Sequence, residues 1–297
     1  MIVVFGCDQS YLPHLSVAIS SLLHNNSHVH ISIYIIHSDI NAKDWDKLLS
    51  LDLHKRHTFI NAKVGGGELN DLLTRDQFSK ATYYRLLIET LVTHDKVLYI
   101  DSDVVVNGSL NDFWNHDITD KYLIAVEEPT MNGNHLGMSP SARYFNAGVL
   151  LINLKKWRDE FISDQVINFI RTETHRLEWL DQCALNAIIN GRWERVSPKY
   201  NLQTAIIEMD VKQRQNRYEF CDSNDAIINP VIIHYTGVSK PWHAYNKHHY
   251  KKIYWHYLRK TPYRRMLPFD MNFRKLAMLC LPEKMRDAVR TSLLNKK

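Results

Sequence analysis

The sequence is poor in the residues that mark several common protein classes. Its 297 residues include four cysteines with no C-x-x-C pair, which excludes a zinc ribbon or a redox dithiol: Cys7, Cys183, Cys221 and Cys280. Only 10 glycines and 9 prolines are present, so the composition is neither collagen-like nor disordered. Nothing requires an oxidising compartment, and we expect reduced thiols in the cytoplasm.

Long hydrophobic runs are missing as well. No stretch approaches the roughly 18 apolar residues of a membrane-spanning helix. The first residues have no basic region and reach Asp8 almost at once, so we expect neither a cleaved signal nor a transmembrane anchor. The chain is instead 45% hydrophobic and 23% charged, which is typical of a globular protein with a substantial core.

The net charge of +5 is unevenly distributed. Residues 251–297 contain 13 Lys and Arg against 3 Asp and Glu, whereas the remainder contains 24 against 29. A slightly acidic body with a basic tail indicates a local anionic partner and disfavours a general polyanion binder.

The first hundred residues alternate between strand and helix patterns. Short apolar runs predict buried strands over Ile2–Cys7, Val29–Ile36, Thr58–Val64 and Lys96–Ile100. Apolar residues at helical spacing predict helices after Pro13, over Ala42–Leu51 and over Ser79–Val92. Strands separated by helices indicate βαβ units and a largely parallel sheet.

The second part of the chain continues as mixed α/β. We expect strands over Tyr122–Val126, Phe145–Asn153 and Val231–Tyr235, and helices over Asp159–Thr172 and Asp181–Ile189. No linker, low-complexity stretch or internal repeat intervenes. The pattern therefore predicts one domain over residues 1–250, followed by a tail over 251–297.

Asp101 and Asp103 form the strongest local feature. They follow an apolar strand, and ligands of such sheets sit beyond the carboxyl ends of the strands. Two carboxylates at i and i+2 project from one side of an extended backbone and can hold a divalent cation. The alternative is a simple turn at the strand end. Asp44 and Asp46 have the same spacing, but in a predicted helix, where we expect solvated surface.

An Asp-x-Asp pair is used by more than one class of protein. In haloacid-dehalogenase-type phosphatases it supplies a nucleophile, but it normally ends the first strand and is followed by an acidic pair, which this sequence lacks. In nucleotide-sugar glycosyltransferases it holds a metal that bridges the diphosphate leaving group. A non-catalytic nucleotide-sugar-binding protein is the third alternative.

A late segment favours the glycosyltransferase interpretation. His234 ends a predicted strand and is followed by Gly237 and Lys240. A histidine beside two carboxylates suits Mn²⁺ better than Mg²⁺. Gly237 allows close backbone approach, and Lys240 can meet phosphate as a point charge. An isolated histidine would more often be an ordinary strand residue, but this spacing favours a ligand.

Six motifs, taken together and in order, resemble family 8 glycosyltransferases, most closely bacterial lipooligosaccharide α-galactosyltransferases and glucosyltransferases. They are Phe5-Gly6-Cys7-Asp8, Thr82–Leu86, Tyr99–Asp103, Tyr144–Trp157, Leu180-Asp181-Gln182 and His234–His243. The resemblance implies a GT-A fold, which is Rossmann-like with a mainly parallel sheet flanked by helices. It also implies a UDP-hexose donor (UDP-galactose or UDP-glucose), Mn²⁺ with Mg²⁺ as a substitute, and transfer with retention of configuration.

The resemblance also implies roles for single residues. Residues 1–105 would form the nucleotide-binding half and 106–250 the sugar and acceptor half. Metal ligands would be Asp101, Asp103 and His234. The nucleoside would be held by Asp8, Ser10 and Tyr11, assisted by Asp101 and the Ser102 backbone. The diphosphate would meet Gly237 and Lys240. The donor sugar would be surrounded by Arg85, Asn146, Ala147, Asp181 and Gln182, of which Arg85, Asn146, Asp181 and Gln182 are the catalytic candidates.

Several of these residues have alternative roles. Arg85 could form a surface ion pair, although its neighbours favour a semi-buried position. Asp181 could also be a helix N-cap. Cys183 stands where relatives often carry an acidic residue, Ser10 replaces an asparagine, and the loop over 128–143, a flap over the donor, is little matched. These departures leave galactose and glucose both open as the donor sugar.

Retention requires either a covalent intermediate or attack on the leaving-group side. Gln182 occupies the position debated in this family as nucleophile, yet a neutral amide is a poor one; Asp181 is chemically better. We favour same-face attack in which a UDP phosphate accepts the proton of the acceptor hydroxyl.

The tail combines cations with aromatic and leucine side chains over residues 248–297. This pattern suits an anionic membrane surface, and a lipid-linked oligosaccharide acceptor at the inner face of the cytoplasmic membrane would explain it. Packing of residues 248–260 on the body is an equal alternative. Nucleic acid is disfavoured because the body is acidic and has no recognition motif. Deletion of 262–297 is predicted to release the protein from membranes without loss of donor hydrolysis.

Overall fold

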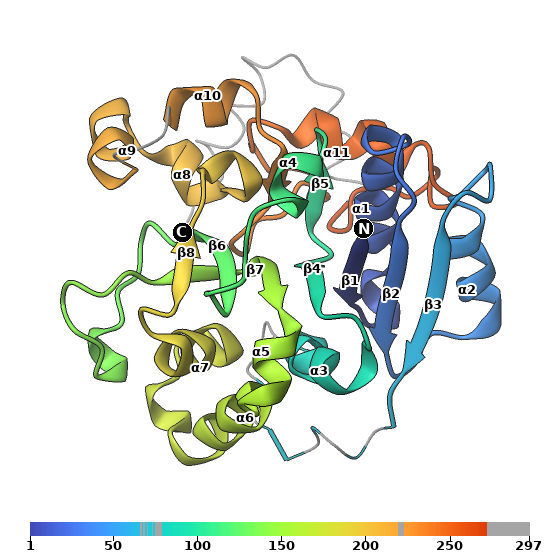
Figure 1. Cartoon of the computed structure of the whole chain (residues 1–297). Helices are drawn as coiled ribbons and strands as arrows, with labels where there is room; N and C mark the ends of the chain where they lie inside the picture. The colour runs from blue at the N-terminus through green and yellow to red at the C-terminus, as the bar shows by residue number, and fades with distance from the viewer. Residues whose placement is uncertain are drawn as a thin grey trace, which may run out of the picture.

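The computed structural model describes residues 1–65, 67, 69, 71–72, 74, 79–218 and 223–271. Its centre is a seven-stranded sheet with the order β3-β2-β1-β4-β7-β6-β8 (Figure 1). The strands are β1 (Ile2–Gly6), β2 (Ser32–His37), β3 (Thr58–Lys63), β4 (Lys96–Ile100), β6 (Leu123–Glu127), β7 (Phe145–Asn153) and β8 (Trp193–Arg195). Strand β7 runs antiparallel to β4 and β6, and the other neighbours are parallel. The prediction of a mainly parallel sheet is confirmed.

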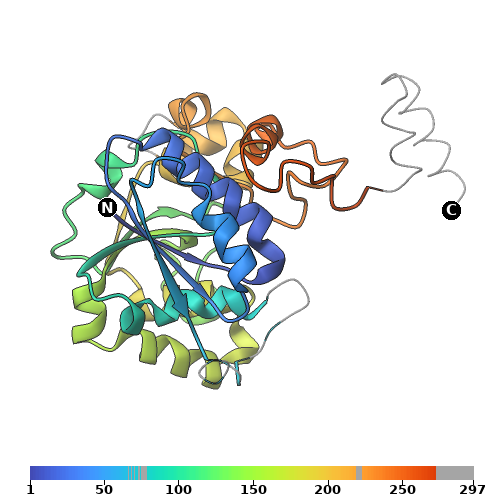
Figure 2. The same cartoon turned by 90° about the vertical axis from the view of Figure 1, so that its right-hand side faces the viewer.

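Both faces of this sheet are buried. In β1, Val3 and Phe5 point into one core, while Val4 points into the other. Burial on both sides explains why the strands read as continuous apolar runs instead of alternating with polar residues. Figure 2 shows α1 on one side of the sheet and the yellow-green helices on the other.

The helices divide between the two cores. The first core is covered by α1 (Leu12–Asn25), α2 (Ala42–Leu49), α4 (Asn111–Trp114), α8 (Thr204–Glu208) and α11 (Lys251–Leu258). The second is covered by α3 (Ile88–Leu91), α5 (Leu154–Asp159), α6 (Ile162–Thr172) and α7 (Leu180–Ile189). Two further helices, α9 (Val211–Arg217) and α10 (Ser223–Ile228), lie between α8 and β10 in the chain.

A second, three-stranded sheet joins distant parts of the chain. Its order is β5 (Val104–Val106), β10 (Ile232–His234) and β9 (Leu202–Gln203). Strand β10 is antiparallel to β5 and parallel to β9. Because β5 begins shortly after β4 ends, this small sheet brings the end of β10 to the carboxyl edge of the large one.

Several predicted boundaries were wrong. The single helix expected over Ser79–Val92 is a 3-10 helix, η2 (Lys80–Leu87), followed by α3. With three residues per turn, η2 places Thr82 and Arg85 on one side, toward the interior. The helix expected over Asp159–Thr172 starts at Ile162, because Asp159 is the last residue of the preceding helix, α5. Strand β2 starts at Ser32, three residues later than expected.

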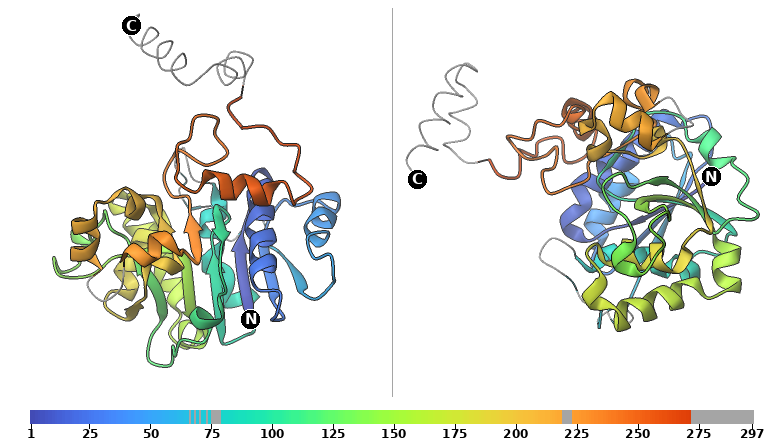
Figure 3. Two further views of the ribbon diagram at one scale, coloured as in Figure 1. Left: turned by 90° about the horizontal axis from the view of Figure 1, so that it is seen from above. Right: turned by 90° about the vertical axis from the view of Figure 1, so that its left-hand side faces the viewer.

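The start of the predicted tail packs on the body. Helix α11 packs against α1 (Figure 3), where Tyr254 and Tyr257 are buried and Asn25 Nδ2 donates to the Tyr257 hydroxyl at 2.8 Å. For residues 248–260 the packing alternative is therefore confirmed. Residues 272–297 of the tail lie outside the described residues. Among the described residues, no helix has the length and apolarity needed to cross a bilayer.

Candidate active site

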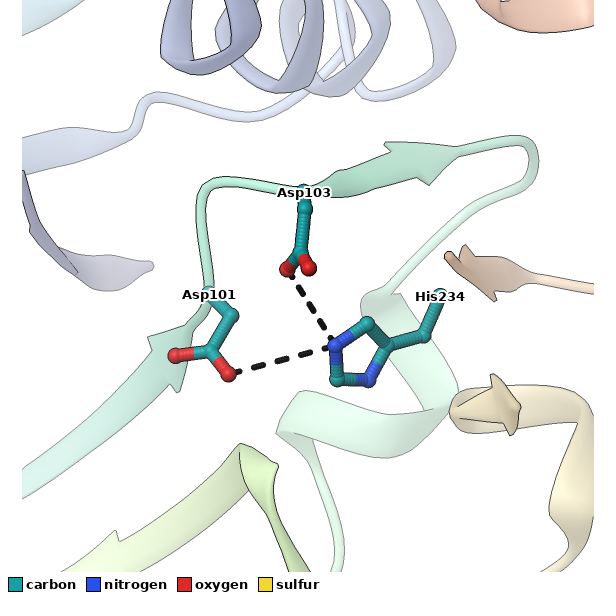
Figure 4. Close-up of side chains that lie close together, drawn as sticks. All are labelled: Asp101, Asp103 and His234. Carbon is teal, nitrogen blue, oxygen red and sulfur yellow. Dashed lines mark ion pairs between the residues drawn. The ribbon is translucent and has the colours of Figure 1, made fainter. Parts of the chain in front are cut away.

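Two aspartates and a histidine converge from three elements (Figure 4). Asp101 follows β4, Asp103 precedes β5, and His234 is the last residue of β10. His234 Nε2 lies 3.2 Å from Asp103 Oδ1 and 3.9 Å from Asp101 Oδ2. One ligand atom from each residue lies within 4.8 Å of the other two. The predicted pairing of the two carboxylates with the late histidine is confirmed as geometry.

The strand pairing explains this convergence. In the β5–β10 pair, His234 lies opposite Val104, directly beside Asp103, and the Tyr235 N–H donates to the Asp103 carbonyl at 3.1 Å. The backbone over residues 101–103 is a bend instead of an extended strand, so the spacing alone does not aim the carboxylates. The β10 register brings the imidazole to them.

Lys240 forms an ion pair inside this cluster that the sequence did not indicate. Its Nζ lies 2.6 Å from Asp103 Oδ2 and donates to the Tyr235 carbonyl at 2.7 Å. Burial by itself raises the pKa of Asp103, but the charges of Lys240 and His234 outweigh it and hold that pKa well below its usual range. Asp103 is therefore an ionised carboxylate at neutral pH.

The donor set fits a divalent cation. Two carboxylates and one imidazole nitrogen suit ions such as Mn²⁺ or Mg²⁺, with the imidazole favouring the softer Mn²⁺. The backbone of Gly148 closes this cradle: a Cβ there would lie 2.2 Å from His234 Cε1 and 2.7 Å from Asp101 Oδ2. Only glycine lets β7 approach the three side chains so closely.

Arg85 connects the cluster to a second group of predicted residues. Its guanidinium is buried, with Nη2 3.0 Å from Asp101 Oδ1 and Nε 2.8 Å from Asp181 Oδ2. Nη1 donates to the Ala147 carbonyl. The alternative of a surface ion pair is therefore wrong: one guanidinium joins two carboxylates and the β7 backbone.

Asp181 and Gln182 lie in the first turn of α7. Asp181 Oδ1 accepts a hydrogen bond from the Thr82 hydroxyl at 2.7 Å, and Gln182 Oε1 accepts one from the Ala147 N–H at 2.9 Å. Burial raises the pKa of the Asp181 carboxyl, although the Arg85 charge opposes it. The N-cap position of α7 is Trp179, so the N-cap role considered for Asp181 is wrong.

The predicted nucleoside end forms around the turn after β1. Asp8 Oδ1 accepts hydrogen bonds from the Ser10 hydroxyl at 2.6 Å and the Tyr11 N–H at 3.1 Å. The Ser102 hydroxyl donates to the Gly6 carbonyl at 3.0 Å, which ties this turn to the Asp101–Asp103 bend. Burial raises the pKa of the Tyr11 hydroxyl, and the charge of Asp103 raises it further. The turn after β1 therefore borders the cluster of Asp101, Asp103 and His234.

Gly237, the last of the predicted residues, follows His234 by three positions. Its φ of +86° lies in the left-handed region, which explains why glycine occupies this turn. With Lys240, it belongs to the segment that leads from β10 back over the cluster.

The comparison with protein families decides the assignment. The model of glycosyl transferase family 8 matches residues 2–246. The chain belongs to this family. It is 29% identical to general stress protein A of Bacillus subtilis, over 88% of this chain and 94% of that protein. It is 27% identical to a lipopolysaccharide 1,2-glucosyltransferase of Escherichia coli K12, over 90% and 80%. The glycosyltransferase GlyE of Streptococcus pneumoniae is 31% identical, over 86% of this chain and 60% of that protein.

Solved structures agree with this family 8 assignment. The galactosyltransferase LgtC in complex with donor and acceptor sugar analogs is 25% identical, with a TM-score of 0.77 over 97% of this chain and 99% of that one. The GT-A fold expected from the resemblance is confirmed. Membership of the family also removes the dehalogenase-type phosphatase from the alternatives.

Three residues that contact the candidate site were not predicted as site residues, although Thr82 begins one of the six motifs. Thr82 binds Asp181, Glu128 accepts a hydrogen bond from Asn146 Nδ2 at 3.2 Å, and Asn201 lies between Asn146 and His234. Thr82 and Glu128 lie among other polar residues, Thr82 near Lys80 and Arg85 and Glu128 next to Glu127, so no local signal marks them. Asn201 stands between Tyr200 and Leu202, a setting like the one that singled out Asn146, and could have been found in the same way.

Proposed function

We propose that this family 8 glycosyltransferase is a Mn²⁺-dependent retaining enzyme that moves galactose or glucose from UDP to a hydroxyl of a lipopolysaccharide- or lipooligosaccharide-type acceptor. The observation that carries the proposal is the juxtaposition of the Asp101, Asp103 and His234 cluster with the Arg85–Asp181 ion pair. The cluster supplies a place for the diphosphate end of the donor, and the ion pair supplies polar groups for the sugar.

Each part of the donor then has its own group of residues. Asp101, Asp103 and His234 would hold the metal, which when bound neutralises the charge that develops on the diphosphate leaving group. Lys240 adds a positive charge at the same point, and the backbone at Gly237 approaches the diphosphate. The nucleoside would be held by Asp8, Ser10, Tyr11 and the Ser102 backbone. The hexose would be surrounded by Arg85, Asn146, Ala147, Asp181 and Gln182.

Donor hydrolysis tests this proposal without knowledge of the acceptor. UDP release is measured over a panel of UDP-sugars with Mn²⁺, with Mg²⁺ and with EDTA. We expect one UDP-hexose to be hydrolysed in a metal-dependent reaction, and Asp103→Asn to lower the rate on the order of 100-fold, the loss typical of one charge-stabilising group. Asp46→Asn is the matched control, because Asp46 belongs to an Asp-x-Asp pair of equal spacing and is itself exposed on α2.

The outcomes separate the remaining alternative from the proposal. Hydrolysis that survives EDTA or Asp103→Asn would overturn the metal assignment. UDP binding without hydrolysis of any donor would indicate the non-catalytic nucleotide-sugar-binding protein instead.

For the chemistry we propose same-face attack, in which a UDP phosphate accepts the proton of the acceptor hydroxyl. The contacts of the two possible nucleophiles support it: the Gln182 amide oxygen is engaged by the Ala147 N–H, and the Asp181 carboxylate by Thr82 and Arg85. We expect Gln182→Ala to keep appreciable turnover and the product to retain the anomeric configuration, as measured by NMR. A glycosyl adduct trapped on Asp181 or Gln182 and found by mass spectrometry would refute same-face attack.

The acceptor and location form a separate part of the proposal. The lipopolysaccharide 1,2-glucosyltransferases among the relatives and the basic tail support a lipid-linked acceptor at the inner face of the cytoplasmic membrane.

The test is a deletion of the tail that leaves the site intact. The Phe269 N–H donates to the Trp242 carbonyl and Asp270 Oδ1 accepts from the Ala244 N–H, so Phe269 and Asp270 hold the segment that carries Lys240. A clean deletion therefore begins at residue 272. We expect the protein that lacks residues 272–297 to move from the membrane fraction to the soluble fraction while it still hydrolyses the donor. If this shortened protein still sediments with membranes, the membrane role of the tail is contradicted.

A further inference from the structure

Asn201 is a fully buried side chain between the metal-ligand candidates and the donor-sugar residues. It follows the 3-10 helix η5 (Pro198–Tyr200) and precedes β9, which pairs with β10. Its Oδ1 lies 2.8 Å from His234 Nδ1, and its Nδ2 lies 2.9 Å from Asn146 Oδ1. Asn201 thereby joins two groups that the proposed function uses separately.

A backbone donor fixes the direction of this hydrogen-bond chain. The Gly148 N–H can only donate, and it lies 3.0 Å from Asn146 Oδ1, so that atom is the amide oxygen. Asn146 Nδ2 then donates to the Glu128 carboxylate, which can only accept when ionised. Since Asn146 presents its oxygen, Asn201 must turn its NH₂ group toward it.

The same logic fixes the tautomer of His234. With its NH₂ group toward Asn146, Asn201 presents its amide oxygen to His234 Nδ1, so Nδ1 must carry a proton. With Nδ1 protonated, Nε2, which faces Asp101 and Asp103, is the ring nitrogen whose lone pair a cation can take. A metal ligand needs that lone pair.

We propose that Asn201 is a positioning residue that fixes the Nδ1–H tautomer and the orientation of His234 for metal binding, and that couples this ligand to the Asn146 side chain beside the sugar. The inference rests on the proposed function, because it takes the three-residue cluster as the metal site. Partners of this kind, hydrogen-bonded to a ligating histidine, typically change metal affinity about 10- to 100-fold when removed.

The wild-type protein allows a first test. Histidine selectively labelled with ¹⁵N is observed by NMR in the enzyme with UDP and diamagnetic Mg²⁺, and the His234 signals are assigned as those lost in His234→Gln. We expect a protonated Nδ1 and an unprotonated Nε2 that ligates the cation. A neutral ring with its proton on Nε2 would overturn the inference.

Variants give the second test, with the Mn²⁺ dissociation constant in the presence of UDP measured by electron paramagnetic resonance of the free ion. Asn201→Ala removes both hydrogen bonds and is expected to weaken Mn²⁺ binding about 10- to 100-fold. Asn201→Asp keeps an acceptor for Nδ1–H but loses the donor to Asn146. It should therefore bind Mn²⁺ close to the wild-type level while its kcat for donor hydrolysis falls.

Asn26→Ala is the matched control for loss of a buried asparagine. Asn26 is also fully buried, but its amide binds the Leu22 and Gly108 carbonyls and the Leu110 N–H, away from the cluster. We expect it to lower stability and leave the Mn²⁺ affinity unchanged.

The outcomes distinguish a failure of this inference from a failure of the proposed function. If Asp103→Asn does not weaken Mn²⁺ binding, the metal site itself is wrong. If Asp103→Asn weakens it and Asn201→Ala does not, the site stands and the role of Asn201 is refuted. Equal weakening by Asn26→Ala would likewise refute a specific role for Asn201.

Discussion

The close approach of β7 to the metal-ligand cluster can be tested at one residue. In Gly148→Ala the new Cβ would lie 2.2 Å from His234 Cε1, more than 1 Å short of the roughly 3.5 Å at which carbon atoms make contact. Strand β7 cannot retreat, because it is paired on both sides with β4 and β6. The His234 ring must therefore move, and it is held by Asn201.

The expected cost follows from this geometry. Forcing extra volume into a well-packed site typically costs about 1–3 kcal/mol of stability. Because the displaced groups are His234 and Asp101 Oδ2, 2.7 Å from the new Cβ, we expect Mn²⁺ affinity to fall by about 10- to 100-fold as well. The free energy of unfolding is measured in urea, and Mn²⁺ binding is measured in the presence of UDP.

A second glycine provides the control for this experiment. Among the described residues, no atom lies within 4 Å of a Cβ placed at Gly65, so Gly65→Ala should leave the Mn²⁺ affinity unchanged and should not lower the stability. If Gly148→Ala binds Mn²⁺ as tightly as the wild type and is equally stable, the packing argument for this site is refuted.

Two further predictions concern buried charge. Arg85→Met leaves the buried Asp181 carboxylate without its cation, and we expect the free energy of unfolding in urea to fall by about 3–5 kcal/mol. Adding Asp181→Asn in the double variant should restore part of this loss. A loss under about 1 kcal/mol would show that the ion pair contributes as little as a surface pair. Burial lowers the pKa of His14 from 6.5 to about 3. As the pH drops below about 6.5, His14 therefore takes up a proton in the unfolded chain but not in the folded one, and the folded state loses stability. His14→Gln should reduce the stability lost between pH 7 and pH 5 by about 2 kcal/mol, and an unchanged pH dependence would contradict the buried neutral imidazole.

The candidate site was predictable where its signals are local. Asp101 and Asp103 follow an apolar strand, and His234, Gly237 and Lys240 have a compact spacing, so both segments could be recognised separately. Arg85 and Asp181 were identified through the family resemblance, but their ion pair joins η2 to α7 and has no counterpart in any single stretch of sequence. Polar residues such as Asn201 carry their role only through contacts with partners far along the chain.

Local patterns were sufficient to predict the α/β class, the positions of the main strands along the chain and the residue types available for a metal and a diphosphate, because apolar periodicity and strand-end motifs are properties of short segments. Which side chains meet became evident only in the three-dimensional arrangement of the strands and helices. The antiparallel register of β5 and β10 sets His234 against Asp103, the β4–β7 pairing sets Gly148 against Asp101, and the packing of α11 on α1 makes the start of the basic tail part of the core. Such pairings depend on long-range contacts, whose partners no local pattern specifies.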